Sequence, residues 1–125
     1  MDRIFFVIGS ILCGLAVATG AFGAHGLQKF VSPERLDTWE KAVRYQFYHA
    51  LAFLVLAWAV THWPEQAKLL MAGGWLFLAG VVLFSGSLYL LVLSDTSWLG
   101  AITPLGGVAF ILGWLCMVIA AWRGG

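Results

Sequence analysis

Residues 69–94 read LLMAGGWLFLAGVVLFSGSLYLLVLS, a run that contains no charged side chain. A helix needs about 20 apolar residues to cross the hydrocarbon core of a bilayer, so this run is long enough for one crossing. A backbone inside lipid must satisfy its own hydrogen bonds, which leaves helices or closed barrels as the spanning structures. The run lacks the alternation of polar and apolar residues that barrel strands show. It therefore predicts a membrane-spanning helix.

Charged residues divide the rest of the chain into three similar runs. Only 10% of the residues are charged, against roughly a quarter in a typical soluble domain, and the mean hydropathy is +0.91. We predict an all-α fold, a bundle of four transmembrane helices in a single membrane domain that covers residues 1–125, with spans at 4–27, 45–64, 69–94 and 98–122. A cleaved signal peptide is the alternative for the first span, because Arg3 precedes an apolar run that ends in small residues. The length of that run and the presence of Asp2 argue against it.

The longest polar segment lies between the first and second spans. Ser32, Pro33 and Glu34 form a typical helix start, with a capping hydroxyl, a proline in the first turn and an acidic residue near the positive end of the helix dipole. Apolar residues then recur at spacings of three and four. The pattern predicts an amphipathic interfacial helix at 33–44. No proline or glycine interrupts the chain before Pro64, so this helix can run directly into the second span.

The composition also limits the classes of function. Seven basic and six acidic residues give a formal net charge of +1, which is too low for a phosphate-neutralising surface and excludes nucleic acid as a partner. Cys13 and Cys116 stand alone in apolar runs and lack the paired spacing of a metal or redox motif. We predict no metal site and no catalytic residue, and the sequence indicates no particular cofactor.

Small residues recur along the spans at intervals that let helices approach closely. Lipid offers little hydrophobic drive between helices, so close packing through small side chains carries much of the association. Packing within one chain is favoured over a dedicated dimer face, and Gly20, Gly23 and Gly26 leave one helix face bare enough for another helix or a flat ligand. The predicted close-packing residues are Gly20, Gly23, Gly26, Gly73, Gly80, Gly106 and Gly113.

Polar residues inside the spans gather in one leaflet, where spans one and three end and spans two and four begin. Each such residue is expensive in lipid unless it has a partner, so the cluster indicates where function would lie. The first interpretation is that these groups hydrogen-bond each other across helices. The second is a site for a lipid headgroup or a small ligand. The candidate ligand-binding residues are His25, Gln46, His49, Ser85, Ser87, Tyr89 and Thr103.

Three further functions remain as alternatives. A haem or quinone redox protein would use His25 and His49 as ligands from two adjacent helices. Ser85 and Ser87 beside a histidine suggest a nucleophile and a base, yet no acid is available to orient the base, so we lean away from an enzyme. A transporter would need a continuous wetted path, and the apolar opposite leaflet argues against one.

Four strings resemble the signature of a known family. They are GAFGAHGL at 20–27, YQFYHAL at 45–51, LFSGSLY at 83–89 and TPLGG at 103–107. The chain resembles the domain of unknown function 423 family, which includes the animal transmembrane protein 256 relatives. This resemblance implies a small bacterial inner-membrane protein with four spans and cytoplasmic termini, and it implies no activity.

The distribution of charge alone does not orient the chain. Three cations accompany the termini and four lie on the opposite side, so the positive-inside count does not decide. Trp39 and Trp98 are predicted at one membrane surface, and Trp63 and Trp122 at the other, as an aromatic belt. The leading hypothesis is a non-enzymatic multi-pass protein of the bacterial inner membrane. It would be a subunit or assembly factor of a larger membrane complex, a homo-oligomer, or a binder of membrane lipid or a small ligand.

Overall fold

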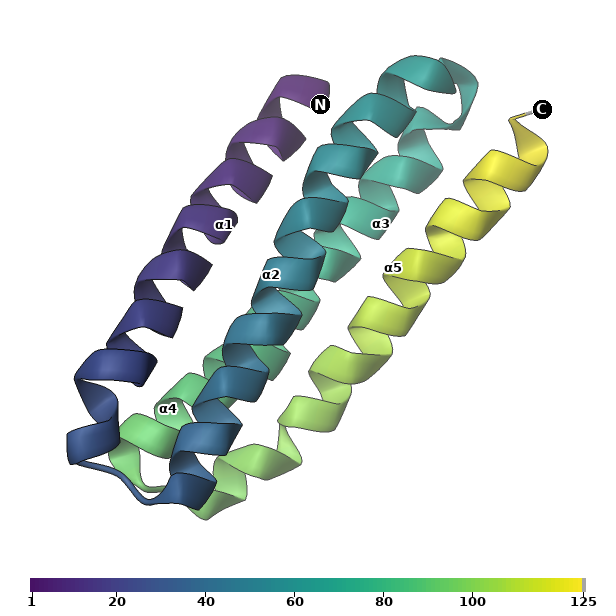
Figure 1. Cartoon of the computed structure of the whole chain (residues 1–125). Coiled ribbons are helices and arrows are strands. Elements are labelled where there is room, and N and C mark those ends of the chain that lie inside the picture. The colour runs from purple at the N-terminus through teal and green to yellow at the C-terminus, as the bar shows by residue number, and fades with distance from the viewer. Residues whose placement is uncertain (125) are drawn as a thin grey trace.

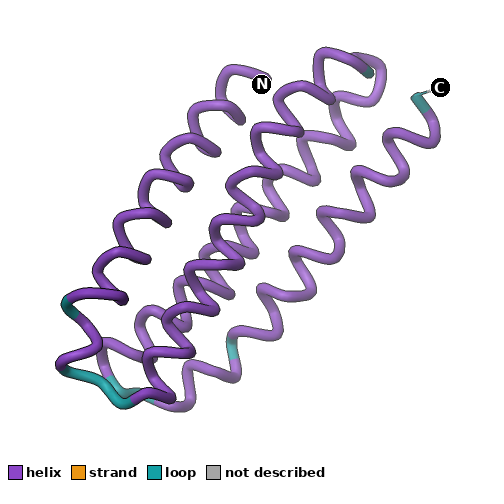
Figure 2. The backbone as a smooth tube through the Cα atoms, viewed as in Figure 1, coloured by secondary structure: helices purple, strands orange, loops and turns teal. Residues whose placement is uncertain are grey.

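Four long helical segments run side by side, and short turns join them at either end (Figure 1 and Figure 2). The structure, a computed structural model, describes residues 1–124. No strand occurs within the described range. The elements in chain order are α1 (Asp2–His25), the 3-10 turn η1 (Leu27–Lys29), α2 (Pro33–His62), the 3-10 turn η2 (Pro64–Gln66), α3 (Ala67–Gly80), the π-helical turn η3 (Val81–Gly86), α4 (Ser87–Ser94), the 3-10 turn η4 (Ser97–Ala101) and α5 (Thr103–Arg123).

Four stretches of helix are long and apolar enough to cross a membrane. They are Asp2–Lys29, Pro33–His62, Pro64–Ser94 and Ser97–Arg123. The predicted all-α fold with four membrane-spanning helices is therefore confirmed. Both termini lie at the same end of the molecule, as an even number of crossings requires (Figure 1).

Helix α2 begins where the capping signal predicts. The Ser32 hydroxyl accepts a hydrogen bond from the backbone N–H of Arg35 at 3.2 Å, and Pro33 occupies the first turn. The helix then continues without a break to His62. The amphipathic segment at 33–44 is thus the first three turns of α2, continuous with the second span. Thirty residues make a helix of about 45 Å, longer than the hydrocarbon core of about 30 Å, so its charged first turns extend beyond that core.

The two middle segments form the centre of the bundle. Helix α1 packs chiefly on α2, and α5 packs chiefly on α3, so α1 and α5 lie on opposite flanks (Figure 1). In the most apolar part of each segment, 44% of the residues are buried in the second and third spans, against 17% in the first and 28% in the fourth. The flanking helices therefore present most of their surface to lipid.

Buried side chains form two clusters at different levels along the bundle. The cluster toward the termini is aromatic: Phe5, Phe53 and Phe77 are completely buried, and the ring centroids of Phe5 and Phe53 lie 5.6 Å apart. The second cluster lies toward the link between α1 and α2 and surrounds Trp39 and Ala42. Its buried members are Leu27, Trp39, Ala42, Leu88, Leu91 and Val92.

Several of the glycines predicted to mediate close packing lie where a side chain would not fit. A Cβ added at Gly106 would lie 2.4 Å from the backbone nitrogen of Phe84, so α5 approaches the middle of the third span at backbone distance. A Cβ at Gly23 would lie 2.7 Å from the Trp39 ring, which occupies the bare face of α1. Gly80 and Gly113 each lie under a phenylalanine ring of the facing helix, and Gly73 and Gly20 make looser contacts. Gly26 meets only Phe22, from its own turn of helix.

The third span is one crossing interrupted by the π-helical turn η3 between α3 and α4. A π turn accommodates one extra residue in a helix and rotates the following side chains relative to those before it. The turn contains Ser85, which is fully buried and donates to the backbone carbonyl of Ala42 on α2 at 2.7 Å. The charge-free run at 69–94 predicts one regular span, because no residue pattern marks such a turn.

Candidate functional site

Gln46 lies at the centre of a chain of hydrogen bonds that joins three helices. It is buried on α2, and its Nε2 donates to the backbone carbonyl of Leu12 on α1 at 2.9 Å. The Tyr89 hydroxyl on α4 donates to its Oε1 at 2.7 Å. The hydroxyls of Tyr89 and Thr19 form a further hydrogen bond at 3.2 Å, which returns the chain to α1. Each hydrogen-bonding group of the Gln46 amide thus has a partner on another helix.

Trp39 joins this chain of hydrogen bonds through the backbone of Thr19 on α1. Its indole Nε1 donates to the backbone carbonyl of Thr19 at 2.8 Å, and its ring lies between Phe22 and Tyr89, with centroid distances of 5.8 Å and 4.6 Å. Only 4% of Trp39 is exposed. The predicted aromatic-belt position is therefore wrong for this residue, because its side chain turns inward onto Gly23 instead of facing the membrane surface.

Two serines of the third span make hydrogen bonds to the neighbouring helices, Ser85 to α2 and Ser87 to α5. Ser85 uses its hydroxyl proton on the carbonyl of Ala42. The Ser87 hydroxyl bonds the carbonyl of Phe84 at 2.9 Å and the hydroxyl of Thr103, the first residue of α5, at 2.7 Å. A hydroxyl donates only one proton, so Ser87 donates to the Phe84 carbonyl and accepts from the Thr103 hydroxyl. These contacts fix the start of α5 against the third span.

His49 forms a separate polar contact deeper along α2. Trp114 on α5 donates its indole N–H to His49 Nε2 at 3.0 Å, and His49 Nδ1 lies 2.7 Å from the carbonyl of Tyr45. An indole N–H can only donate, so Nε2 must accept and the ring proton must reside on Nδ1. The imidazole also stacks on Phe110 with a centroid distance of 3.6 Å. Both nitrogens of the neutral ring are thus engaged within the protein.

His25 does not join the other predicted residues. It is the last residue of α1 and is exposed, whereas His49 lies ten residues beyond Trp39, the residue that packs near the end of α1. Ten helical residues correspond to about 15 Å. The alternative of a haem or quinone site that uses both histidines is therefore not supported. Within residues 1–124, no three side chains among His, Cys, Asp and Glu come together in a way that could hold a metal ion.

The described structure leaves no buried polar side-chain atom without a partner. Every buried side-chain nitrogen or oxygen in residues 1–124 makes a hydrogen bond within the chain. We call these hydrogen bonds between helices, taken together, the polar layer. It contains six of the seven residues predicted for the site, which are Gln46, His49, Ser85, Ser87, Tyr89 and Thr103. Three further partners in these hydrogen bonds are not among the residues predicted from the sequence: Thr19, Trp39 and Trp114. The one signal for the two tryptophans was the indole N–H, which requires an acceptor when it lies inside a helix bundle, and nothing in the sequence marked Thr19.

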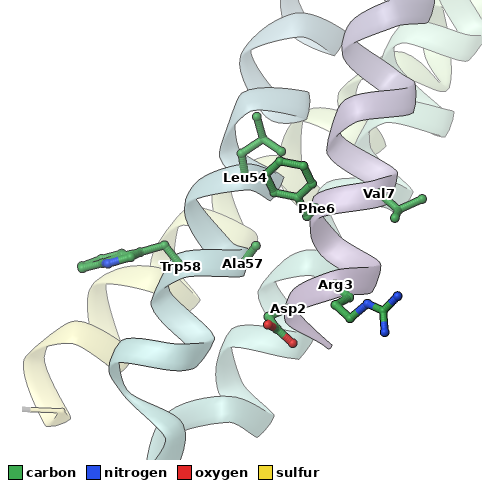
Figure 3. Close-up of a pocket in the computed structure, with 7 residues that line it drawn as sticks. All are labelled: Asp2, Arg3, Phe6, Val7, Leu54, Ala57 and Trp58. Atoms are coloured by element: carbon green, nitrogen blue, oxygen red, sulfur yellow. The ribbon is translucent and has the colours of Figure 1, made fainter.

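Two of the cavities outside the polar layer are lined by both α1 and α2. One is a groove of about 450 Å³ between α1 and α2 near the N-terminus. Phe6 points toward Leu54 and Ala57 across this groove, whereas Arg3 and Val7 point away from α2 (Figure 3). Its walls are apolar except at the end near the N-terminus, where Asp2 and Arg3 lie, so lipid chains can fill its apolar part. The other, larger cavity lies at the opposite end of α1.

The fold and the polar layer together define a class: a small integral membrane protein whose four helices are fastened to each other by internal hydrogen bonds. Residues 19–107 match the model of a family described as "Protein of unknown function (DUF423)". The chain belongs to this family, as the four signature strings predicted.

Bacterial relatives match almost the whole chain. It is 47% identical over 121 residues to a UPF0382 membrane protein of Staphylococcus aureus strain bovine RF122 / ET3-1, which covers 97% of both chains. It is 48% identical over 119 residues to the UPF0382 membrane protein YwdK of Bacillus subtilis strain 168, which covers 95% of this chain and 96% of the relative. No solved structure matches the chain significantly.

Proposed function

We propose that the protein is a non-enzymatic component of the bacterial plasma membrane that acts by binding on its outer surface, as a subunit or assembly factor of a larger complex or as a lipid binder. The observation that carries this proposal is the internal satisfaction of the polar layer. A substrate site needs polar groups that are free to receive the substrate, whereas here each buried one is engaged within the chain. The polar layer thus acts as a framework that holds the helices in a fixed arrangement.

The residue pairings support the same function. His49, the one buried histidine among residues 1–124, accepts from Trp114 and therefore cannot also act as a base toward Ser85, whose proton is directed at Ala42. No carboxylate lies in the polar layer, so a nucleophile there would lack the group that orients its base. The surface that remains for interaction is the outer face of α1 and α5, together with the two cavities at the ends of α1.

Native mass spectrometry of the affinity-tagged protein, extracted in a mild detergent, tests this function. We expect a protein partner or lipid to remain bound in wild type and in the polar-layer variants Gln46→Leu and Tyr89→Phe, provided that circular dichroism shows each variant to be folded. A small molecule retained by wild type and lost from both folded variants would make the polar layer the site and overturn the proposal. A Soret band in the absorbance spectrum would do the same in favour of haem.

We also propose that both termini face the cytoplasm. The family resemblance and the absence of any cation from the link 95–97 support this orientation, although the raw positive-inside count is even. Fusions of green fluorescent protein and of alkaline phosphatase to the C-terminus provide the test. We expect fluorescence from the first and no activity from the second, and the reverse pattern would overturn this orientation.

A further inference from the structure

The larger cavity encloses about 660 Å³ at the end of the bundle where α1 and α4 finish. It lies between the last turn of α1, the link that leads to α2, and the last turn of α4. These three elements meet at the lower end of α1 in Figure 1. Pockets for small molecules commonly enclose about 300 to 1,000 Å³, so the cavity is large enough for part of an amphiphile. Most of its wall is apolar, and its lining residues are Phe22, Leu27, Phe30, Val31, Val92 and Leu93, together with the polar Ser32, Arg35 and Asp95.

The polar lining residues occupy the outer end of this cavity. Ser32 and Arg35 belong to the start of α2, and Asp95 follows the end of α4, whereas Phe22 and Val92 lie within the last turns of their helices. Phe30, which is 82% exposed, and Trp98, which is 67% exposed, flank this end of the bundle. Exposed aromatic side chains are typical of the headgroup level of a bilayer. The cavity therefore has an apolar interior and a charged mouth at the depth of lipid headgroups.

Two opposite charges stand side by side at this mouth. Arg35 Nη2 donates to Asp95 Oδ1 and to Ser97 Oγ, each at 3.0 Å, and Arg35 with Asp95 is the only ion pair between two side chains in residues 1–124. Both hydrogen bonds of the Arg35 side chain within that range use Nη2. A guanidinium carries five N–H donors in a fixed fork, so the donors on Nε and Nη1 are left for a ligand. The Asp95 side chain is 84% exposed and can accept from a second group.

We propose that this cavity binds a phospholipid whose headgroup carries both a phosphate and a primary ammonium group. The phosphate accepts hydrogen bonds from the remaining donors of Arg35, and the fork of a guanidinium suits two phosphate oxygens at once. The ammonium donates to the Asp95 carboxylate. The glycerol and the first part of one acyl chain lie against Phe22, Val92 and Leu93. Charge complementarity selects this class, because an anionic headgroup would place a second negative charge beside Asp95, and a trimethylated ammonium has no proton to donate.

This lipid site is separate from the polar layer, and it rests on the lipid-binding form of the proposed function, for which it names the lipid class and the cavity. The proposed function fails if the polar layer binds a small molecule, whatever happens at the cavity. The lipid site fails if headgroup selectivity is absent, and a protein partner bound elsewhere would be unaffected. The two outcomes can therefore be distinguished with the same purified protein.

The test is a competition measured by native mass spectrometry on delipidated protein. Dilauroyl phosphatidylethanolamine, phosphatidylglycerol and phosphatidylcholine are added at equal concentration. We expect a single adduct of the ethanolamine lipid to predominate, and Arg35→Gln to weaken it about tenfold, as the loss of charged hydrogen bonds predicts. Arg44→Gln is the matched control, because it removes the same charge from the exposed side of α2 outside the cavity. Equal binding of the three lipids by wild type, or equal effects of the two arginine variants, would overturn the proposal.

A second pair of variants tests the cavity without changing any charge. Leu93→Trp puts a large ring into the cavity and should reduce binding of the ethanolamine lipid, whereas Leu90→Trp, on the same helix but outside the lining, should not. The leucines are 60% and 57% exposed, so neither change disturbs the core. Undiminished binding to the folded Leu93→Trp variant would exclude the cavity as the site.

Discussion

The half of the bundle that carries the termini and the half that carries the link between α1 and α2 are held together by different interactions. Phenylalanine rings fill the first half, where Phe5, Phe53 and Phe77 are fully buried. Directional hydrogen bonds through Gln46 and Tyr89 join the helices of the second. In lipid the hydrophobic effect gives little preference between one helix neighbour and another, because lipid tails are as apolar as the side chains. The aromatic half therefore contributes packing, and the polar half determines which helices are neighbours and in which register.

The largest effect expected from this comparison is on packing in the aromatic half. Phe77→Ala removes a ring that lies 4.9 Å from Trp114 and 5.3 Å from His49 between centroids, and it leaves a cavity beside Gly113. We expect the free energy of unfolding to fall by about 2 kcal/mol, which is less than the same change costs in the core of a water-soluble protein. The difference arises because in the unfolded state the ring is surrounded by lipid instead of water, so only its packing contacts are lost. Unfolding in increasing dodecyl sulfate, followed by circular dichroism, provides the measurement. Phe6→Ala is the control, because Phe6 is 56% exposed to lipid, and equal losses for the two variants would contradict this role of the ring.

A smaller effect is expected in the polar half, with a consequence for specificity. Gln46→Leu keeps the approximate volume but removes the acceptor of the Tyr89 hydroxyl proton and the side-chain donor to the Leu12 carbonyl. Hydrogen bonds between membrane helices contribute about 0.6 to 1.7 kcal/mol, so we expect a loss of about 1 kcal/mol. We also expect a cysteine pair placed across α1 and α2 to crosslink in more than one register. Gln28→Leu is the control, because Gln28 is exposed in η1. A single register in Gln46→Leu would show that packing alone sets the pairing.

The four membrane crossings and the polar residues on each helix could be predicted from the sequence. The hydrogen-bond partners of those polar residues could not. Charge-free runs fix where a chain can enter lipid, and the Ser32 cap marks the start of α2. The rotation of each helix about its axis depends on packing across the whole bundle, and residue spacing does not reveal it. For this reason His25 was predicted in the polar layer and is exposed at its edge. The π turn adds a further rotation, which brings Ser85 to the Ala42 carbonyl.

The smallest effect expected is at the contact between the two halves. Trp114→Phe keeps an aromatic ring beside Phe77 but removes the N–H that His49 Nε2 accepts. One such hydrogen bond contributes about 0.5 to 1 kcal/mol to the free energy of unfolding, and the loss should be at the lower end of this range because Trp114 is 43% exposed to lipid.

The sharper measurement is the nitrogen NMR spectrum of histidine-labelled protein, in which wild-type His49 should show the tautomer protonated at Nδ1. In Trp114→Phe the Nε2 acceptor has no donor, so the signal should move toward a mixture of tautomers, whereas Trp98→Phe, a change at an exposed indole on η4, should leave it unchanged. An unaltered His49 signal in Trp114→Phe would mean that the carbonyl of Tyr45 alone fixes the ring, and that the two halves meet through stacking and not through a hydrogen bond.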